Sequence, residues 1–333
     1  MDTISVQQKF FLEIKNQLPS HLSLVDEIAD LLNISPDSAY RRIRGEKPID
    51  FEEIKKLVNH YKLSLDHFFH LDSNAIVFSD RSVSSNVSFH FDLYLQAVIE
   101  DLTYMNSFEN KRLYHLNKDV PIFHHFVFPE LAAFKCFFWR KSIVHDPVFS
   151  KEKFVLSKYT PLVVEAGKKI NALFAQLPTV EIWNVESIHS TLRQIEYYKN
   201  SGMFESRDDL ITIYERLYKV IEMIEFYAEN GDKHHPDTPL AKGADYKMYI
   251  NEFILGDNTI LVELNDKKLV YINHGVINYM KTTDEKFCAF TYDHFQNIIK
   301  RSTPISGVNE KERSRFFNKI KEKITTRQAA IYH

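Results

Sequence analysis

The sequence predicts a mainly α-helical protein with a five-helix N-terminal domain and a larger, mostly helical α+β domain that contains a small antiparallel sheet. Apolar residues recur at helical spacing through residues 5–70 and again between 89 and 230. Beyond residue 245, the segments MYINEFIL, TILVEL and KLVYINH are rich in β-branched and aromatic residues instead. A length of 333 residues also favours two domains.

The boundary between the domains is predicted from a change in composition. The stretch LDSNAIVFSDRSVSSNV, residues 71–87, is rich in Ser, Asn and Asp and has no helical spacing. We therefore place the N-terminal domain at residues 1–72, a linker at 73–87 and the larger domain at 88–333.

Short helices account for the whole N-terminal domain. They are expected at residues 6–18, 24–32, 36–44, after Asp50, and at 64–69. The fourth helix follows Asp50, and Glu53 stands where it would complete a capping box. Its apolar stripe is expected to consist of Phe51, Ile54, Leu57, Val58 and Tyr61.

The larger domain is expected to alternate long helices with one group of strands. Helices are predicted at residues 89–105, 160–177, 185–200, 207–230, 293–300 and 309–324. The small sheet is predicted near residues 247–274, with a hairpin turn at Asn265–Lys268. The aromatic stretch PIFHHFVFPELAAFKCFFW is predicted to be a core helix rather than an apolar ligand pocket.

Composition excludes several classes of protein. The eight glycines lie too far apart for any glycine-rich phosphate loop, dinucleotide fingerprint or nucleophile elbow. No H-E-x-x-H or C-x-x-C occurs, and His124–His125 and His234–His235 are poor chelates because neighbouring side chains diverge. We therefore expect no catalytic residues, no metal and no cofactor. The polar start and two distant cysteines predict a cytoplasmic protein with no membrane span.

The stretch SPDSAYRRIRGEKP carries the most specific signal in the sequence. Ser35 is expected to cap a short helix that begins at Pro36. Helical spacing places Ala39 and Ile43 on one packing face, with the three arginines on the polar side, and Gly45 can end the helix. A helix, a three-residue turn and a second helix with a basic face suit the DNA major groove, where arginine can bond guanine O6 and N7.

Residues 5–70 resemble the helix-turn-helix domain of the Cro/cI repressor type, also called the XRE type. The segments EIADLLNIS, PDSAYRRIRGEKP and FEEIKKLVNHYKLSLDHFF carry the resemblance, which covers about a fifth of the chain. Val25 stands where many members carry Gln, and Asn33 stands at the turn glycine. The resemblance implies sequence-specific binding to double-stranded DNA, usually as a homodimer, with residues 36–44 as the recognition helix. The DNA-contacting residues that it implies are Asp37, Ser38, Tyr40, Arg41, Arg42, Arg44 and Lys47.

These observations predict a transcriptional regulator whose larger domain dimerises or senses an unidentified small-molecule or peptide effector. Residues 1–70 carry 9 Lys and Arg against 11 Asp and Glu, so a DNA-binding surface must be local. Two alternatives stay open for the larger domain. Helical hairpins at 160–230 would suit a peptide- or protein-binding scaffold. A buried cluster of carboxylates or histidines in one pocket would instead indicate an enzyme of unfamiliar type.

Overall fold

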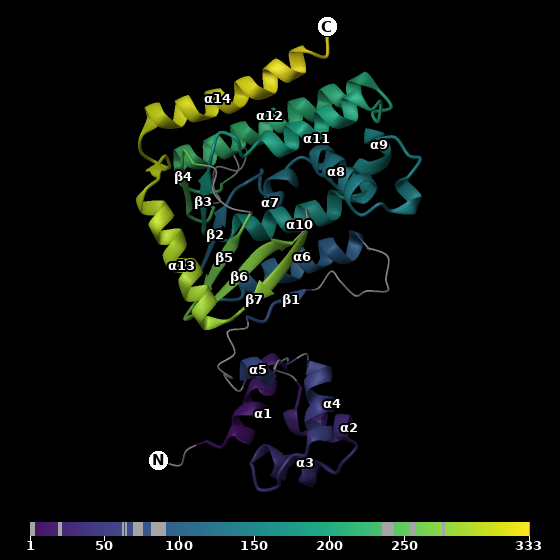
Figure 1. Ribbon diagram of the computed structural model, residues 1–333, viewed down its shortest axis with the longest axis vertical. Helices are drawn as coiled ribbons and strands as arrows, with labels where there is room; N and C mark the ends of the chain where they lie inside the picture. The colour runs from purple at the N-terminus through teal and green to yellow at the C-terminus, as the bar shows by residue number, and fades with distance from the viewer. Residues whose placement is uncertain are drawn as a thin grey trace. The chain divides into compact units, whose positions relative to one another are not determined.

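The chain forms two compact units, residues 1–77 and 78–333. The computed structural model (Figure 1) describes residues 4–18, 22–61, 63, 65–68, 76–80, 91–234, 243–253, 258–274 and 277–332. Ser79–Asp80 form strand β1 of the larger unit, so the prediction of a linker is wrong at these two residues. A two-residue edge strand has no periodicity by which the sequence could reveal it. The linker positions 73–75 and 81–87 lie outside the described residues.

The N-terminal unit contains the five predicted helices. They are α1 (Val6–Gln17), α2 (Leu24–Leu32), α3 (Pro36–Ile43), α4 (Phe51–Tyr61) and α5 (Leu65–Phe68). Their inner faces meet in a core whose buried members are Phe10, Phe11, Ile14, Ile28, Ala29, Leu32, Ala39 and Leu57. Phe51 was predicted to belong to the apolar stripe of α4, but it lies at the first position of the helix and is 88% exposed.

The larger unit is built on an eight-stranded mixed sheet in the order β1-β7-β6-β5-β2-β3-β4-β8. Strands β2, β3 and β4 are parallel, and the other neighbours pair antiparallel. The prediction of a small antiparallel sheet is therefore wrong in both size and type. The strands after β1 are β2 (Lys111–Leu116), β3 (Thr179–Trp183), β4 (Tyr246–Ile250), β5 (Ile260–Leu264), β6 (Lys267–His274), β7 (Asn278–Thr282) and β8 (Thr303–Pro304).

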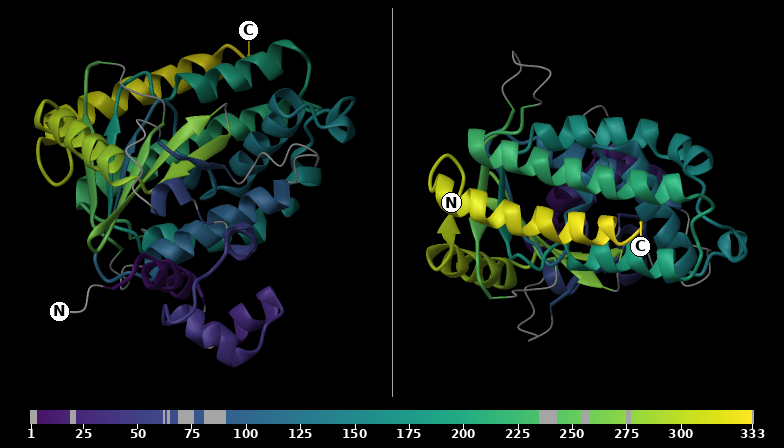
Figure 2. Two further views of the ribbon diagram at one scale, coloured as in Figure 1. Left: turned by 60° about the horizontal axis from the view of Figure 1, so that its bottom comes forward. Right: turned by 90° about the horizontal axis from the view of Figure 1, so that it is seen from above.

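Helices cover both faces of this sheet (Figures 1 and 2). One face carries a thick helical layer that shares the main core with the sheet. Its principal helices are α6 (Phe91–Asn106), α7 (Ile122–His125), α8 (Pro129–Phe138), α10 (Val164–Ala175), α11 (His189–Asn200) and α12 (Arg207–Asn230). The opposite face is covered by α13 (Glu285–Lys300), which closes a second core. Among the described residues, none of the helices has the length and apolar character needed to cross a bilayer.

The last helix, α14 (Glu310–Ala329), lies along α12 (Figure 2). Its apolar residues Phe316, Phe317, Ile320 and Ile324 are buried in the main core. The aromatic stretch around α7 and α8 is buried there too, as the core interpretation predicted.

Candidate nucleic-acid interface

The turn between α2 and α3 has the backbone that the sequence predicts. Asn33 ends α2 in the left-handed conformation, with φ 56°, and the Ile34 amide donates to the Ala29 carbonyl at 3.0 Å. Ser35 then caps α3, because its Oγ accepts from the Ser38 amide at 3.3 Å. The turn is therefore three residues long, and it is closed by hydrogen bonds at both of its ends.

The C-terminal end of α3 is also capped by hydrogen bonds. Gly45 takes φ +76°, a conformation that a side chain would strain. Its amide donates to the Arg42 carbonyl at 2.9 Å, and the Glu46 amide donates to the Arg41 carbonyl at 2.8 Å. This pair of bonds is the Schellman motif. The two amides of the motif thereby satisfy carbonyls that the end of the helix would otherwise leave unpaired.

Helix α1 holds the exit from α3 against the rest of the unit. Gln7 Nε2 donates to the carbonyls of Arg42 and Lys47, at 2.7 Å each. Gln8 Nε2 donates to the Arg44 carbonyl at 2.8 Å. The two glutamines thus fix the backbone from which the basic side chains project, and neither was identified from the sequence. Their partners lie at least 35 residues away, so no local pattern could reveal the contact.

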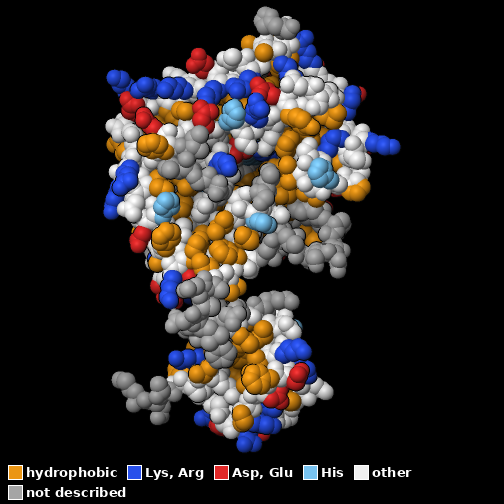
Figure 3. Space-filling view, in the orientation of Figure 1, with side chains coloured by type: hydrophobic (Ala, Val, Ile, Leu, Met, Phe, Trp, Pro, Cys, Tyr) orange, Lys and Arg blue, Asp and Glu red, His pale blue; other side chains and the backbone are white. Residues whose placement is uncertain are grey.

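Most of the predicted DNA-contacting side chains are exposed on α3 and the segment after it. Asp37, Tyr40, Arg41, Arg44 and Lys47 are exposed, and Ser38 is partly exposed. Among the described residues, the Arg41 guanidinium makes no hydrogen bond or ion pair. The Arg44 guanidinium lies 5.6 Å from the centre of the Tyr40 ring. Its Nε lies 3.4 Å from Glu46 Oε1. Figure 3 shows Lys and Arg side chains gathered at the tip of this unit, where α3 lies.

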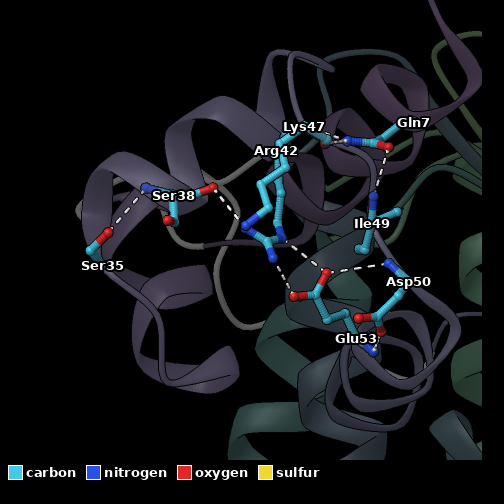
Figure 4. Close-up of polar contacts among 8 residues, drawn as sticks. All are labelled: Gln7, Ser35, Ser38, Arg42, Lys47, Ile49, Asp50 and Glu53. Atoms are coloured by element: carbon cyan, nitrogen blue, oxygen red, sulfur yellow. Dashed lines mark hydrogen bonds and ion pairs between the residues drawn. The ribbon is translucent and has the colours of Figure 1, made fainter.

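Arg42 is the exception, because it is not exposed on the polar face of α3 where the sequence analysis placed it. Its side chain is buried beneath α3 and only 6% of the residue is exposed (Figure 4). Nε donates to Glu53 Oε2 at 2.9 Å and Nη2 donates to Glu53 Oε1 at 2.6 Å. Nη1 reaches the Ser38 carbonyl at 3.3 Å. Arg42 follows Ala39 by three positions, which places it on the packing face of the helix.

Glu53 links this ion pair to the start of α4. Its amide donates to Asp50 Oδ1 at 2.8 Å, and its Oε2 accepts from the Asp50 amide at 3.3 Å. The capping box predicted from the sequence is therefore present. The same carboxylate also neutralises Arg42, so one side chain joins the ends of two helices.

His124 and His234 have ordinary structural partners. His124 Nε2 lies 2.8 Å from Glu181 Oε1 inside the main core. His234 hydrogen-bonds to Asp232, and His235 lies outside the described residues. Within the described part of the chain, no three His, Cys, Asp or Glu side chains come together in a way that could hold a metal ion.

The structure bears on the two alternatives for the larger unit, a peptide-binding scaffold and an enzyme. Strand β3 lies between α10 and α11 in the chain and enters the middle of the sheet, so residues 160–230 are not a run of helical hairpins. This observation counts against the peptide-binding scaffold. Asp119, His115 and His125 line one cavity of the larger unit, so the enzyme alternative stays open.

Comparison of the chain with family models, curated proteins and solved structures finds no match to any of them.

Proposed function

We propose that this protein is a cytoplasmic, sequence-specific DNA-binding transcriptional regulator of the Cro/cI type. In this proposal α3 enters the major groove, and the larger unit dimerises the protein or senses a signal. The observation that carries the proposal is the α2–turn–α3 segment. Its backbone is held by hydrogen bonds at both ends, and it presents Arg41, whose side chain is unpaired within the described part of the chain.

The exposed side chains divide into base-reading and backbone-binding groups. Arg41 has all its donors free among the described residues, so it can bond a guanine edge bidentately. Arg44 packs over Tyr40 and follows it by one helical turn, so we assign both to the phosphate backbone beside the groove. Lys47 lies beyond the end of α3 and is assigned to a phosphate. Arg42 has no role in contacting DNA, because Glu53 takes its donors inside the unit.

The net charge of the exposed surface determines how strongly non-specific DNA binding should depend on salt. With Arg42 paired inside, the exposed charged side chains of residues 36–48 are Arg41, Arg44 and Lys47 against Asp37 and Glu46. The surface is thus only slightly basic. Counterion release scales with the number of phosphates neutralised, so we expect weak non-specific binding and a shallow dependence on salt. Specific affinity then has to come from base contacts and from pairing two half-sites in a dimer.

Binding-site selection on genomic fragments with the intact protein tests the proposal. The expected result is a two-fold symmetric site whose half-sites are about one helical turn, or a multiple of it, apart. Arg41→Ala should then weaken specific binding by about 1–3 kcal/mol and relax the preference at one base. Arg315→Ala is the matched control, since Arg315 is an exposed arginine on α14. Failure to select any sequence, or equal affinity of Arg41→Ala, Arg44→Ala and the control, would contradict the proposal.

A further inference from the structure

Asp37 is an exposed acidic side chain in the first turn of α3, the helix that we assign to the major groove. Successive residues of an α-helix are about 100° apart, so Asp37 and Arg41 both project about 160° away from Ala39. Ala39 is fully buried and Arg42 is 6% exposed, so these two side chains define the packing face of α3. Asp37 and Arg41 therefore share the opposite face, which is the one that a groove would meet.

The Asp37 carboxylate has no ion pair or hydrogen bond among the described residues. The other exposed acid of this surface, Glu46, differs, because its Oε1 lies 3.4 Å from Arg44 Nε. Arg41 follows Asp37 by four positions, a spacing at which an acid and a base often pair along a helix. Within the described part of the chain the two do not pair, so both keep their hydrogen-bonding capacity for a partner outside the protein.

A carboxylate on a DNA-facing surface has an electrostatic cost. It approaches phosphates of the same sign, and on entering the groove it loses the water that hydrates its oxygens. An acid in the first turn also stabilises a helix, but that effect does not require a place on the groove-facing side. A hydrogen-bond donor on the DNA would offset both costs, and the edges of the bases determine which donor that is.

Only two of the four bases present donors in the major groove. Cytosine presents its N4 amino group, whereas adenine presents N6 beside the acceptor N7. Guanine O6 and N7 and thymine O4 are acceptors, which would repel a carboxylate. A carboxylate has only acceptors, so cytosine is its best partner. Asparagine has both a donor and an acceptor, so it matches adenine bidentately instead.

We propose that Asp37 reads the N4 amino group of a cytosine in each half-site and disfavours guanine and thymine at that base, an inference that rests on the proposed function and adds a second base-reading residue to Arg41. Four residues of α-helix rise about 6 Å, which is less than two base-pair steps of about 3.4 Å each. The cytosine is therefore expected within two base pairs of the guanine that Arg41 contacts.

Binding-site selection with the intact wild-type protein, Asp37→Asn and Arg41→Ala tests the inference. Arg41→Ala should lose the preference for the guanine and so identifies that position. Asp37→Asn should change the cytosine position to adenine and leave the guanine position as it is in the wild-type protein. In the wild-type site, replacing that cytosine with adenine should weaken binding of the wild-type protein about 5- to 150-fold, and should strengthen binding of Asp37→Asn.

Asp37→Ala removes the carboxylate without supplying another base-reading group. It should show no preference at the cytosine position, and it should bind unrelated sequences more tightly than the wild-type protein does, because an exposed negative charge is gone. Glu13→Gln is the matched control, since Glu13 is an exposed acid on α1 and lies outside α3. This change should leave the selected site as it is. A retained guanine preference shows that a variant is folded.

Three results would overturn the inference. The first is a wild-type site with no cytosine within two base pairs of the guanine, and the second is the same selected site in both Asp37 variants as in the wild-type protein. The third is a change that falls on the guanine itself, since Asp37 would then position Arg41 rather than read a base. Each of these leaves DNA binding intact, whereas failure of the wild-type protein to select any site contradicts the proposed function and this inference together.

Discussion

Replacing Glu53 with Gln should destabilise the N-terminal unit without touching the proposed DNA surface. The change removes the charge that neutralises Arg42, while the amide oxygen of Gln can still accept from the Asp50 amide and so preserve the capping box. Arg42 would then be a buried guanidinium with no counter-charge, because 6% of the residue is exposed.

The expected loss of stability in Glu53→Gln follows from the burial of the Arg42–Glu53 ion pair. Breaking a buried ion pair by removing one partner costs about 3–5 kcal/mol. The side chains of Arg42 and Glu53 are 7% and 15% exposed, so some water reaches the carboxylate side of the pair. We therefore expect the lower end of that range, about 3 kcal/mol. Arg42→Met removes the charge but keeps the apolar stem of the side chain. The group left unpaired is then Glu53, which is better solvated than Arg42, so we expect a smaller loss of stability, about 2 kcal/mol.

Hydrogen exchange of the intact protein, followed by mass spectrometry on peptides from α2 and α4, measures this loss within the unit itself. A loss of about 3 kcal/mol corresponds to about 160-fold faster exchange of the slowest amides. The double variant Arg42→Met/Glu53→Gln should be more stable than the sum of the single changes predicts, because neither charge is left unpaired.

Arg41→Met is the matched control for the same experiment. Arg41 is exposed and unpaired among the described residues, so its loss should change stability by less than about 0.5 kcal/mol. Equal exchange rates in Glu53→Gln and Arg41→Met would refute the assignment of Arg42 as a structural residue, and would return it to the set of possible DNA contacts.

Three further predictions concern charge, backbone and pH. Lys47→Ala should lower affinity for all sequences alike and reduce the slope of log K against log salt by about 1, measured by fluorescence anisotropy at several salt concentrations. Gly45→Ala should destabilise the N-terminal unit by about 1–2 kcal/mol in the same exchange experiment, because φ is +76°. The pKa values of His115 and His125 are lower in the folded protein than in the unfolded chain, so the stability they contribute is complete above about pH 6.5 and declines as the pH falls toward 5. Urea denaturation followed by near-ultraviolet circular dichroism should show that decline, and His115→Phe should make it shallower; a flat profile in the wild-type protein would contradict it.

Local chemistry made the helix-turn-helix segment predictable. The cap at Ser35, the left-handed Asn33 and the glycine that ends α3 each depend on residues within a few positions of one another. Sequence spacing contains that information directly. The direction of Arg42 does not follow in the same way, because its partner Glu53 lies on another helix. Helical spacing places Arg42 near the polar face, but it does not show that the Glu53 carboxylate can pair with Arg42 inside the unit.

The sheet was underestimated for a different reason. Its central strands β2 and β3 are short and almost wholly buried, so they lack the alternation that reveals a half-exposed strand. β3 is only five residues long and falls between two clear helices, where the sequence reads as a connection. Their parallel pairing also depends on residues more than 60 positions apart in the chain. Strands β4, β5 and β6 fall in the region where the sequence predicts a sheet, whereas β7 and β8 were not predicted. β5 and β6 form a hairpin, which is a local structure.

The pair His124–His125 shows how far a local argument reaches. Successive side chains of a helix diverge, and this is the reason that no shared metal is expected from the sequence. The same divergence sends the two rings to different places: His124 bonds Glu181 in the core, whereas His125 lines the cavity. The groups that meet there come from α6, β2, α8 and the β6–β7 region, and no spacing rule connects them.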